Sequence, residues 1–298
     1  MGEKCLHNPV LLEEALHFLN PAPGKIIIDA TVGGGGHAEE IVRRICPGGT
    51  LIGMDRDSES LRIAHERLKE FQTTVKLVNK NFKDIKETML DLGTGGVDGI
   101  LFDLGISSIQ LEAKERGFSI KHDGPLDMRM DRNQRLTAKD LVNKLSETEL
   151  SSLIKEFGEE RFNKRIAWRI VTERKKRPIE NTAELAGIVS RSMPRGKKWQ
   201  KIHPATRTFQ ALRIRVNSEL IAIEEALNAV PDLLKPGGRV CVISFHSLED
   251  RIVKNILKKF KSQGIFRILT KKPVTAGAAE LSQNPRARSS KLRAAAKI

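Results

Sequence analysis

Short apolar runs and amphipathic stretches alternate along the first hundred residues of the chain. Four runs have the length and composition of buried strands, namely KIIIDA, LIGMDRD, VKLVN and GVDGILFDLG. Amphipathic patterns, with apolar positions three or four residues apart, lie at residues 9–20, from about His37 onward and at residues 59–71. All-apolar strands that alternate with helices are typical of a parallel sheet covered on both faces, so we expect an α/β fold.

The alternation stops at about residue 113 and resumes near residue 216. Between these points the chain has the pattern of amphipathic helices joined by polar loops, as in AKDLVNKLSETELSSLIKEFG. Beyond them we expect helices at 218–234 and 250–261, and strands at 238–245 and 266–270. The pattern therefore predicts one α/β domain, formed by residues 1–112 and 216–298, with a helical insertion at 113–215.

The composition narrows the class of protein. The 298 residues carry 52 Lys and Arg against 37 Asp and Glu, a net charge of +15. No apolar run approaches the ~20 residues that span a bilayer, and the amino-terminal MGEKCLHNPVLLEE lacks the apolar core of a secretory signal. The three cysteines lack the spacing of metal ligands. We therefore expect a cytoplasmic protein without membrane contact and without a metal site.

The positive charge is concentrated in two segments. Residues 161–215 contain sixteen basic and three acidic residues, and residues 286–297 contain five basic residues and no acid. Clustered Lys and Arg attract a polyanion, so two such clusters favour a nucleic-acid partner, although composition does not distinguish DNA from RNA. For a single cluster such as Arg174–Arg177, a solvated, salt-bridged surface is the alternative.

A glycine run follows the first predicted strand and precedes a predicted helix. Gly33, Gly34, Gly35 and Gly36 allow backbone amides to approach a ligand, and the start of the helix favours negative charge there. The same run satisfies the dinucleotide pattern through Gly33, Gly35 and Ala38, so the run alone does not decide the cofactor.

Acidic residues end three successive strands of the predicted sheet. Asp55 is placed to accept hydrogen bonds from ribose hydroxyls, and Asp29 and Asp103 end the first and fourth strands, where open sheets bind ligands. Phe82 follows the third strand and could lie against an adenine. The alternatives are a helix cap for Asp55 and core packing for Phe82. Three carboxylates suit a ligand with an amino group better than a pyrophosphate, which favours methyl transfer over a nicotinamide dehydrogenase.

Several longer motifs are far more specific than these patterns. The sequence resembles the MraW/RsmH family, S-adenosylmethionine-dependent methyltransferases of small-subunit ribosomal RNA. The motifs that carry the resemblance are HNPVLLEEAL, DATVGGGGHA, DRD, DLGISSIQ, RGFS, DGPLDMRMD, HPATRTFQALRIRVNSEL, GGRVCVISFHSLEDRIVK and NPRARSSKLRAAAK. They run in order from one end of the chain to the other. The resemblance implies a class I (Rossmann-like) methyltransferase sheet with a helical insertion domain.

The resemblance also implies a cofactor, a substrate and a set of site residues. The cofactor is S-adenosylmethionine, and the substrate is the exocyclic amine of a cytidine in 16S ribosomal RNA, within the small ribosomal subunit. The cofactor contacts fall on Gly35, Gly36, His37, Asp55, Phe82, Asp103 and Gln110. We expect the two basic segments to bind the ribosomal RNA backbone. The alternatives are a methyltransferase of another RNA or nucleic-acid amine, and an assembly factor that binds the cofactor without turnover.

The segment after the fourth strand supplies the candidate catalytic residues. DNA amino-methyltransferases usually place a Pro-Pro-aromatic motif there, whereas this chain has DLGISS. A cytidine amine is a poor nucleophile, so hydrogen-bond acceptors close to its hydrogens would assist transfer. The candidates are Asp103, Ser107 and Ser108, and the alternative for the serines is that they cap the following helix.

Overall fold

The structure is a computed structural model that describes residues 9–194 and 202–298. The chain divides into two compact units, one formed by Met1–Ser107 with Leu220–Ile298 and the other by Ser108–Glu219. We call them the sheet unit and the helical unit. Some residues singled out above lie outside the described residues: Cys5, the His7 and Asn8 that begin HNPVLLEEAL, and the basic residues Arg195, Lys197, Lys198 and Lys201.

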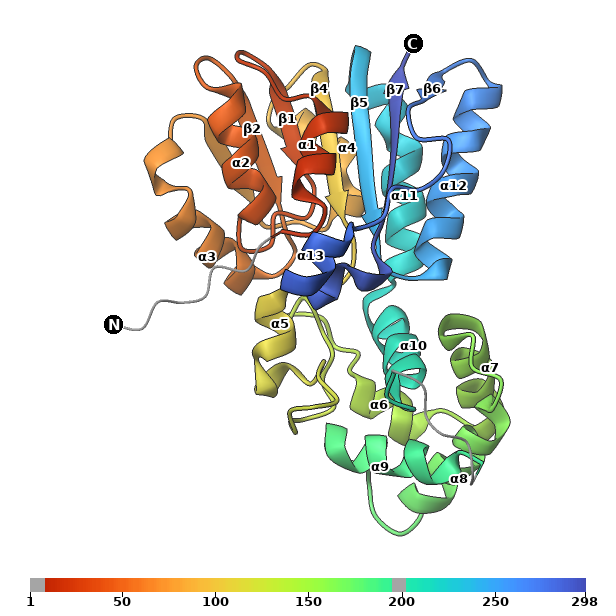
Figure 1. The fold of residues 1–298 in the computed structure, drawn as a ribbon. Coiled ribbons are helices and arrows are strands. Elements are labelled where there is room, and N and C mark those ends of the chain that lie inside the picture. Colours follow the sequence, from red (N-terminus) through yellow and green to blue (C-terminus); the bar gives the residue numbers. More distant parts are fainter. Residues whose placement is uncertain (1–8, 195–201) are drawn as a thin grey trace. The chain divides into compact units, whose positions relative to one another are not determined.

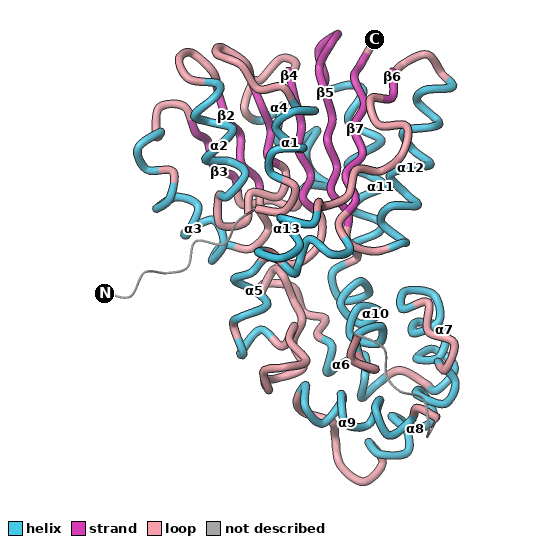
Figure 2. Tube along the Cα trace, viewed as in Figure 1, coloured by secondary structure: helices cyan, strands magenta, loops and turns pink. Residues whose placement is uncertain are grey.

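The described residues of the sheet unit form a seven-stranded sheet in the order β3-β2-β1-β4-β5-β7-β6 (Figures 1 and 2). The strands are β1 (Ile26–Asp29), β2 (Thr50–Met54), β3 (Val75–Val78), β4 (Val97–Asp103), β5 (Leu234–Ser244), β6 (Phe266–Ile268) and β7 (Lys291–Lys297). The first five pair in parallel, which confirms the predicted α/β fold class. The expectation of an all-parallel sheet is wrong at β7, which lies antiparallel between β5 and β6.

Helices cover both faces of this sheet. They are α1 (Leu12–Leu19), α2 (Gly36–Ile45), α3 (Ser58–Arg67), α4 (Ile85–Asp91), α11 (Glu219–Leu233), α12 (Ser247–Ser262) and α13 (Ala278–Gln283), with 3-10 turns η1 (Lys69–Phe71), η2 (Phe82–Asp84) and η4 (Pro285–Ser289). Successive strand side chains point to opposite faces, so Ile27 joins the core beneath α1 and α2 while Ile28 joins the core beneath α11 and α12. The buried strands are apolar throughout because both faces are covered.

The helical unit is built from short helices, some of which have side-chain caps. They are α5 (Ser108–Glu112), η3 (Lys114–Arg116), α6 (Ala138–Lys144), α7 (Glu147–Gly158), α8 (Asn163–Arg174), α9 (Thr182–Ser192) and α10 (Thr206–Asn217). Thr137 with Asp140 and Ser146 with Glu149 form capping boxes, which begin α6 and α7 as separate helices. A further cap comes from Arg174, whose guanidinium donates to the carbonyls of Val142 and Leu145 at the end of α6, at 2.6 Å each.

None of the described helices is both long enough and apolar enough to cross a membrane.

Candidate active site

Three carboxylates lie at the carboxyl ends of neighbouring strands in the sheet unit. Asp29 ends β1 and Asp103 ends β4, and Asp55 comes directly after β2. The register pairs Asp29 with Gly53 of β2 and with Leu101 of β4, so the three strands end at nearly the same level. Parallel pairing thus brings together three acids that are far apart in the sequence.

Burial and neighbouring negative charges raise the pKa values of these carboxyl groups. Burial raises the pKa of Asp29 to about 7, and the neighbouring charge of Asp55 adds to this effect. The pKa of Asp103 lies well above its ordinary value, first because the group is buried and then because Asp29 and Glu249 are close. Like charges in a poorly hydrated site favour the neutral acid, or else a bound cation that offsets them.

The His37 ring lies beside one oxygen of Asp103. The Nε2 of His37 donates to the carbonyl of Val10 at 3.0 Å, which leaves Nδ1 as the acceptor that faces Asp103 Oδ2 at 3.6 Å. Burial lowers the pKa of His37 to about 4, so the ring is neutral at pH 7. The other oxygen, Asp103 Oδ1, is buried and has no hydrogen-bond partner within the described part of the chain. A buried oxygen of this kind is suited to a ligand that brings its own N–H donor.

Asp55 ties the glycine turn to the end of β2. Its Oδ2 accepts from the Gly33 amide at 3.0 Å, and its Oδ1 accepts from the Asp57 amide at 2.8 Å. Burial raises the pKa of Asp55 to about 6. The cap of α3 is Asp57, whose side chain accepts from the Glu59 amide. Asp55 is therefore not the helix cap, and each of its oxygens keeps a lone pair for a further donor.

The glycine turn adopts a backbone that other residues rarely adopt. Gly33 has φ +51° and Gly35, the N-cap of α2, has φ +83°. A Cβ on Gly35 would also lie 3.4 Å from Arg67 Cδ, and one on Gly36 would lie 3.2 Å from Pro9 Cγ. The sequence pattern found these glycines because left-handed backbone conformations are open mainly to glycine.

Phe82 lies in η2 and is half-buried. Its ring contacts the ring of Phe102 edge to face, with centroids 6.0 Å apart, and the side chain packs against the core beneath α11 and α12. Core packing is therefore part of its role, and the adenine contact stays a prediction.

The remaining predicted site residues surround the start of α5. Ser107 directly precedes this helix and Ser108 is its first residue, and both side chains are half-buried. Gln110 is buried, with 4% of its surface exposed. Ser107 belongs to the sheet unit, whereas Ser108 and Gln110 belong to the helical unit. Their roles in catalysis and cofactor binding stay predictions.

Two further groups in the sheet unit belong to this site. The Oε2 of the fully buried Glu249 accepts from the amides of Phe245 and His246, and its charge raises the pKa of Asp103. The Thr31 hydroxyl accepts from the Asp103 amide at 2.6 Å. Sequence reasoning missed both, although the spacing of His246 and Glu249 is that of a capping box at the start of α12.

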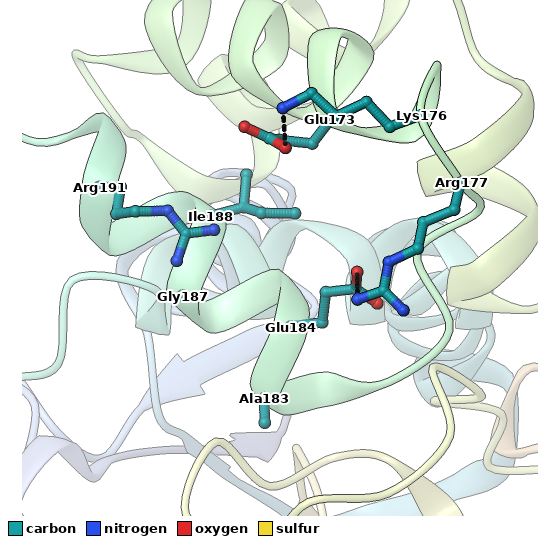
Figure 3. A pocket seen from close by; sticks show the side chains of 8 residues that line it. All are labelled: Glu173, Lys176, Arg177, Ala183, Glu184, Gly187, Ile188 and Arg191. Carbon is teal, nitrogen blue, oxygen red and sulfur yellow. Dashed lines mark hydrogen bonds and ion pairs between the residues drawn. The ribbon is translucent and has the colours of Figure 1, made fainter.

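The basic run Arg174–Arg177 is largely occupied within the helical unit. Arg174 caps α6, Lys176 pairs with Glu173 at 2.9 Å and Arg177 pairs with Glu184 at 3.0 Å. Figure 3 shows the last two pairs in a pocket of about 360 Å³ that is also lined by Arg191. Arg174 thus serves the fold and the salt-bridged alternative describes Lys176 and Arg177, while RNA binding by this run stays a prediction.

The second basic segment is likewise part of the fold. Its residues from Lys291 onward form strand β7. Arg293 binds Asp250 at 2.7 Å, Lys291 lies 3.4 Å from the same carboxylate, and Lys297 donates to the carbonyls of Pro231 and Leu234. These three cations are thus taken up by protein groups, and the segment is not a basic arm.

The strand order and the acidic strand ends define a class of protein. A seven-stranded α/β sheet with an antiparallel β7 between β5 and β6 is the fold of class I methyltransferases, as predicted. Residues 4–298 match the MraW methylase family, and the chain belongs to this family. The resemblance drawn from the sequence is thereby confirmed, and with it S-adenosylmethionine as the cofactor of the family.

Curated relatives match along the whole chain. The chain is 50% identical to "Ribosomal RNA small subunit methyltransferase H" of Pelobacter propionicus, over 98% of each chain. It is also 50% identical to the protein of the same name from Persephonella marina, over 98% of this chain and 99% of the relative. Among solved structures, an rRNA methylase from Streptococcus thermophilus is 10% identical over 98% of each chain, with a TM-score of 0.46.

Proposed function

We propose that this protein transfers a methyl group from S-adenosylmethionine to the exocyclic amine of a cytidine in small-subunit ribosomal RNA. The observation that carries the proposal is the end-to-end identity of about one half with proteins named as small-subunit ribosomal RNA methyltransferases. The cytidine and its amine come from the resemblance of the DLGISSIQ and DGPLDMRMD motifs to the family. A cytoplasmic location also stays a prediction.

The sheet unit is suited to hold S-adenosylmethionine. Asp103 Oδ1 is buried without a partner among the described residues, and the acidic cluster of Asp29, Asp55 and Asp103 repels itself unless protons or a cation offset it. The ammonium and sulfonium groups of the cofactor carry the positive charge that such a cluster lacks. Gly35, with φ +83°, shapes the turn at the start of α2, where backbone amides and the helix N-terminus favour a negatively charged group of the ligand.

Each predicted contact has a defined chemical part. Asp55 has one free lone pair on each oxygen for the ribose hydroxyls, and the half-buried Phe82 offers a ring for the adenine. Asp103 Oδ1, the buried oxygen without a partner among the described residues, accepts from the ammonium end of the cofactor. We place Gln110, which the family pattern adds, among the same contacts.

The reaction requires alignment and then removal of a proton. S-adenosylmethionine supplies, when bound, a methyl group on a sulfonium, which is an excellent leaving group. The protein has to hold the target nitrogen in line with the methyl carbon, and this orientation lowers the entropic part of the barrier. Asp103 or the hydroxyls of Ser107 and Ser108 accept hydrogen bonds from the amine, and burial with the nearby Asp29 and Glu249 raises the pKa of Asp103, which makes its carboxylate a stronger base.

The catalytic residues can be tested one at a time. Each of Asp103, Ser107 and Ser108 is replaced by Ala, and the rate of methyl transfer is timed in a single turnover at saturating cofactor. We expect at least one variant to slow the chemical step by about 100-fold or more. An unchanged chemical step in all three variants would refute their role in catalysis.

The helical unit offers an RNA contact along one face of α8, together with Arg161, which precedes the N-cap of this helix. Arg161, Lys164, Arg165 and Trp168 are all exposed and follow the spacing i, i+3, i+4 and i+7, so they share one side. Trp168 exposes half of its surface, which is unusual for a large aromatic side chain. Unpaired RNA bases stack on such rings, and the neighbouring cations bind phosphates.

The function is tested by mapping the modifications of ribosomal RNA by mass spectrometry. Small subunits from cells that lack the protein are incubated with S-adenosylmethionine and either the wild type or the Asp103→Asn variant. We expect one cytidine to gain 14 mass units, the net mass of an added CH2, with the wild type only. Methylation of a different base or of no base would favour the two alternatives, another nucleic-acid amine or an assembly factor without turnover.

A further inference from the structure

One side of α12 carries a row of lysines. Lys254, Lys258 and Lys261 are spaced four and three residues apart, which places them on the same side of the helix. All three are exposed. Like charges at this spacing destabilise a helix slightly, so the row lowers the stability of α12 in the absence of a partner.

A second set of cations faces this row. Figure 1 shows α12 beside β6, at the edge of the sheet. Arg267 lies in β6 and Lys271 follows it, and both are exposed. The two sets line a groove of about 440 Å³, whose apolar lining includes Leu257 and Ile268. We call it the α12/β6 groove.

No carboxylate lines the groove. Its sixth cation, Arg293, is neutralised by Asp250, and that pair fixes one wall. The other five cations, namely Lys254, Lys258, Lys261, Arg267 and Lys271, have no hydrogen bond or ion pair from their side chains to any described residue. This differs from the basic run of the helical unit, where Lys176 and Arg177 each have an acidic partner.

We propose that the α12/β6 groove binds the phosphate backbone of the RNA substrate, as a contact on the sheet unit in addition to the one on the helical unit. The inference rests on the proposed function for the identity of the polyanion. Five unpaired cations on two adjacent elements match a run of phosphates, because each bound phosphate releases counterions and relieves the repulsion within the lysine row. Contacts to phosphate carry no sequence information directly, so binding of the backbone in this groove would position the RNA rather than select a sequence.

Charged side chains at a sheet edge have another known use. Lysines on an edge strand prevent pairing with the edge of a second molecule, and β6 is the edge strand here. That role concerns the strand itself and does not require three lysines on the helix beside it. It also predicts aggregation when the charges are removed, which RNA binding does not.

The test compares two variants with equal loss of charge. The groove variant carries Lys258→Gln and Lys261→Gln, and the control carries Lys69→Gln and Lys76→Gln, exposed lysines in η1 and in β3 at the opposite edge of the sheet. Binding of the full chain to fluorescent 16S ribosomal RNA is measured by anisotropy from 50 to 300 mM salt. We expect the groove variant to bind about tenfold more weakly near 100 mM salt, with a slope of log affinity against log salt that is flatter by about 1.5.

The control is expected to bind like the wild type, and both variants should stay monodisperse with unchanged or higher melting temperatures. Equal loss in both variants would overturn the proposal, because it would show a diffuse effect of net charge. Aggregation of the groove variant alone, or binding of the wild type to anionic phospholipid vesicles but not to RNA, would overturn it as well. Methylation of the RNA is measured separately: a wild type that binds RNA through the groove without methylating it refutes the proposed function but not the groove.

Discussion

The sheet unit contains two clusters of like charge that are stabilised in opposite ways. At the ends of β1, β2 and β4, Asp29, Asp55 and Asp103 are buried or half-buried, and their pKa values are raised. In the α12/β6 groove, five cations are exposed to water and keep their charge. Burial makes charge repulsion costly and raises the pKa values of the carboxyl groups, whereas water screens the repulsion between cations at the surface.

The difference predicts how each cluster responds to its surroundings. The acidic cluster should respond to pH and to a bound cation, because its protons are held by the lack of solvation. The α12/β6 groove should respond to salt, because its cations are exposed and dissolved ions screen exposed charges. The acidic cluster, the buried and exposed cations of the helical unit, and the glycine turn each lead to a testable prediction.

The largest effect is expected at Asp103. Asp103→Asn keeps the shape but removes the charge, so calorimetric binding of S-adenosylhomocysteine should weaken and methyl transfer should fall by about 100-fold to 1000-fold. The matched control is Asp98→Asn near the other end of β4, where the acid binds Lys235 and the Ile26 amide. Similar transfer rates in the two variants would contradict the role of Asp103.

Asp29 should make the stability of the cofactor-free protein depend on pH. Its pKa is raised from 3.8 to about 7 in the folded state, so its stabilising effect is complete below pH 3.8 and is lost as pH rises through about 7. Asp29→Asn cannot ionise, so its free energy of unfolding relative to wild type should increase between pH 4 and pH 8, by at most about 4 kcal/mol. Denaturant unfolding at several pH values measures this difference.

Asp98 provides the opposite sign as a control. Although burial acts to raise its pKa, the Ile26 amide and Lys235 hold the pKa below its ordinary value. Asp98→Asn should therefore be less stable than wild type above about pH 4, and this difference should shrink as pH falls below about 4 through the lowered pKa of Asp98. If the free energy of unfolding relative to wild type changed in the same direction with pH for Asp29→Asn and Asp98→Asn, the pKa values of the two carboxyl groups would not be shifted in opposite directions.

In the helical unit, the neighbouring cations Arg174 and Lys175 should contribute differently to stability, because they differ in burial. Arg174→Met removes both hydrogen bonds to the end of α6 and should lower the free energy of unfolding by about 1–3 kcal/mol. Lys175→Met, at the next and exposed position, should change it by less than about 0.5 kcal/mol. Thermal unfolding of the two variants decides the point, and equal melting temperatures would refute the capping role.

The smallest effect is expected in the glycine turn. Gly35→Ala places a Cβ at φ +83° and near Arg67, so it should lower the free energy of unfolding by about 1–2 kcal/mol. Gly34→Ala, where φ is not positive, should cost less than Gly35→Ala. A larger cost at Gly34, measured by denaturant unfolding, would argue against the backbone explanation.

The parts of the fold that follow local patterns could be predicted from the sequence. The first four strands and the helices between them are apolar runs of clear period, and the glycine turn lies where the strand-to-helix pattern places it. The antiparallel β7 could not be predicted, because no local pattern states which neighbour a strand pairs with. The same holds for the candidate site. The acids at the strand ends could be predicted from the sequence, whereas Glu249 comes close to Asp103 only through the pairing of β4 with β5.

Charge was the least reliable guide. Counting Lys and Arg pointed to residues 161–215 and 286–297, but partners that are distant in sequence take up Arg174, Arg293 and Lys297. The five cations of the α12/β6 groove lie within residues 251–279, a stretch with eight Lys and Arg and no Asp or Glu, so the same count would also have pointed to this stretch. Pairing, which only the fold decides, determines which cations remain available to a partner.

The pairing of β4 with β5 has a consequence for synthesis on the ribosome. Asp103 lies opposite Ile243 in this pair, and the whole helical unit is encoded between the two strands. At 5–20 residues per second, β4 emerges roughly 7–28 s before its partner. During this interval the nascent chain presents an apolar strand edge with nothing to pair with, while the helical unit already has all of its own residues and is free to fold first.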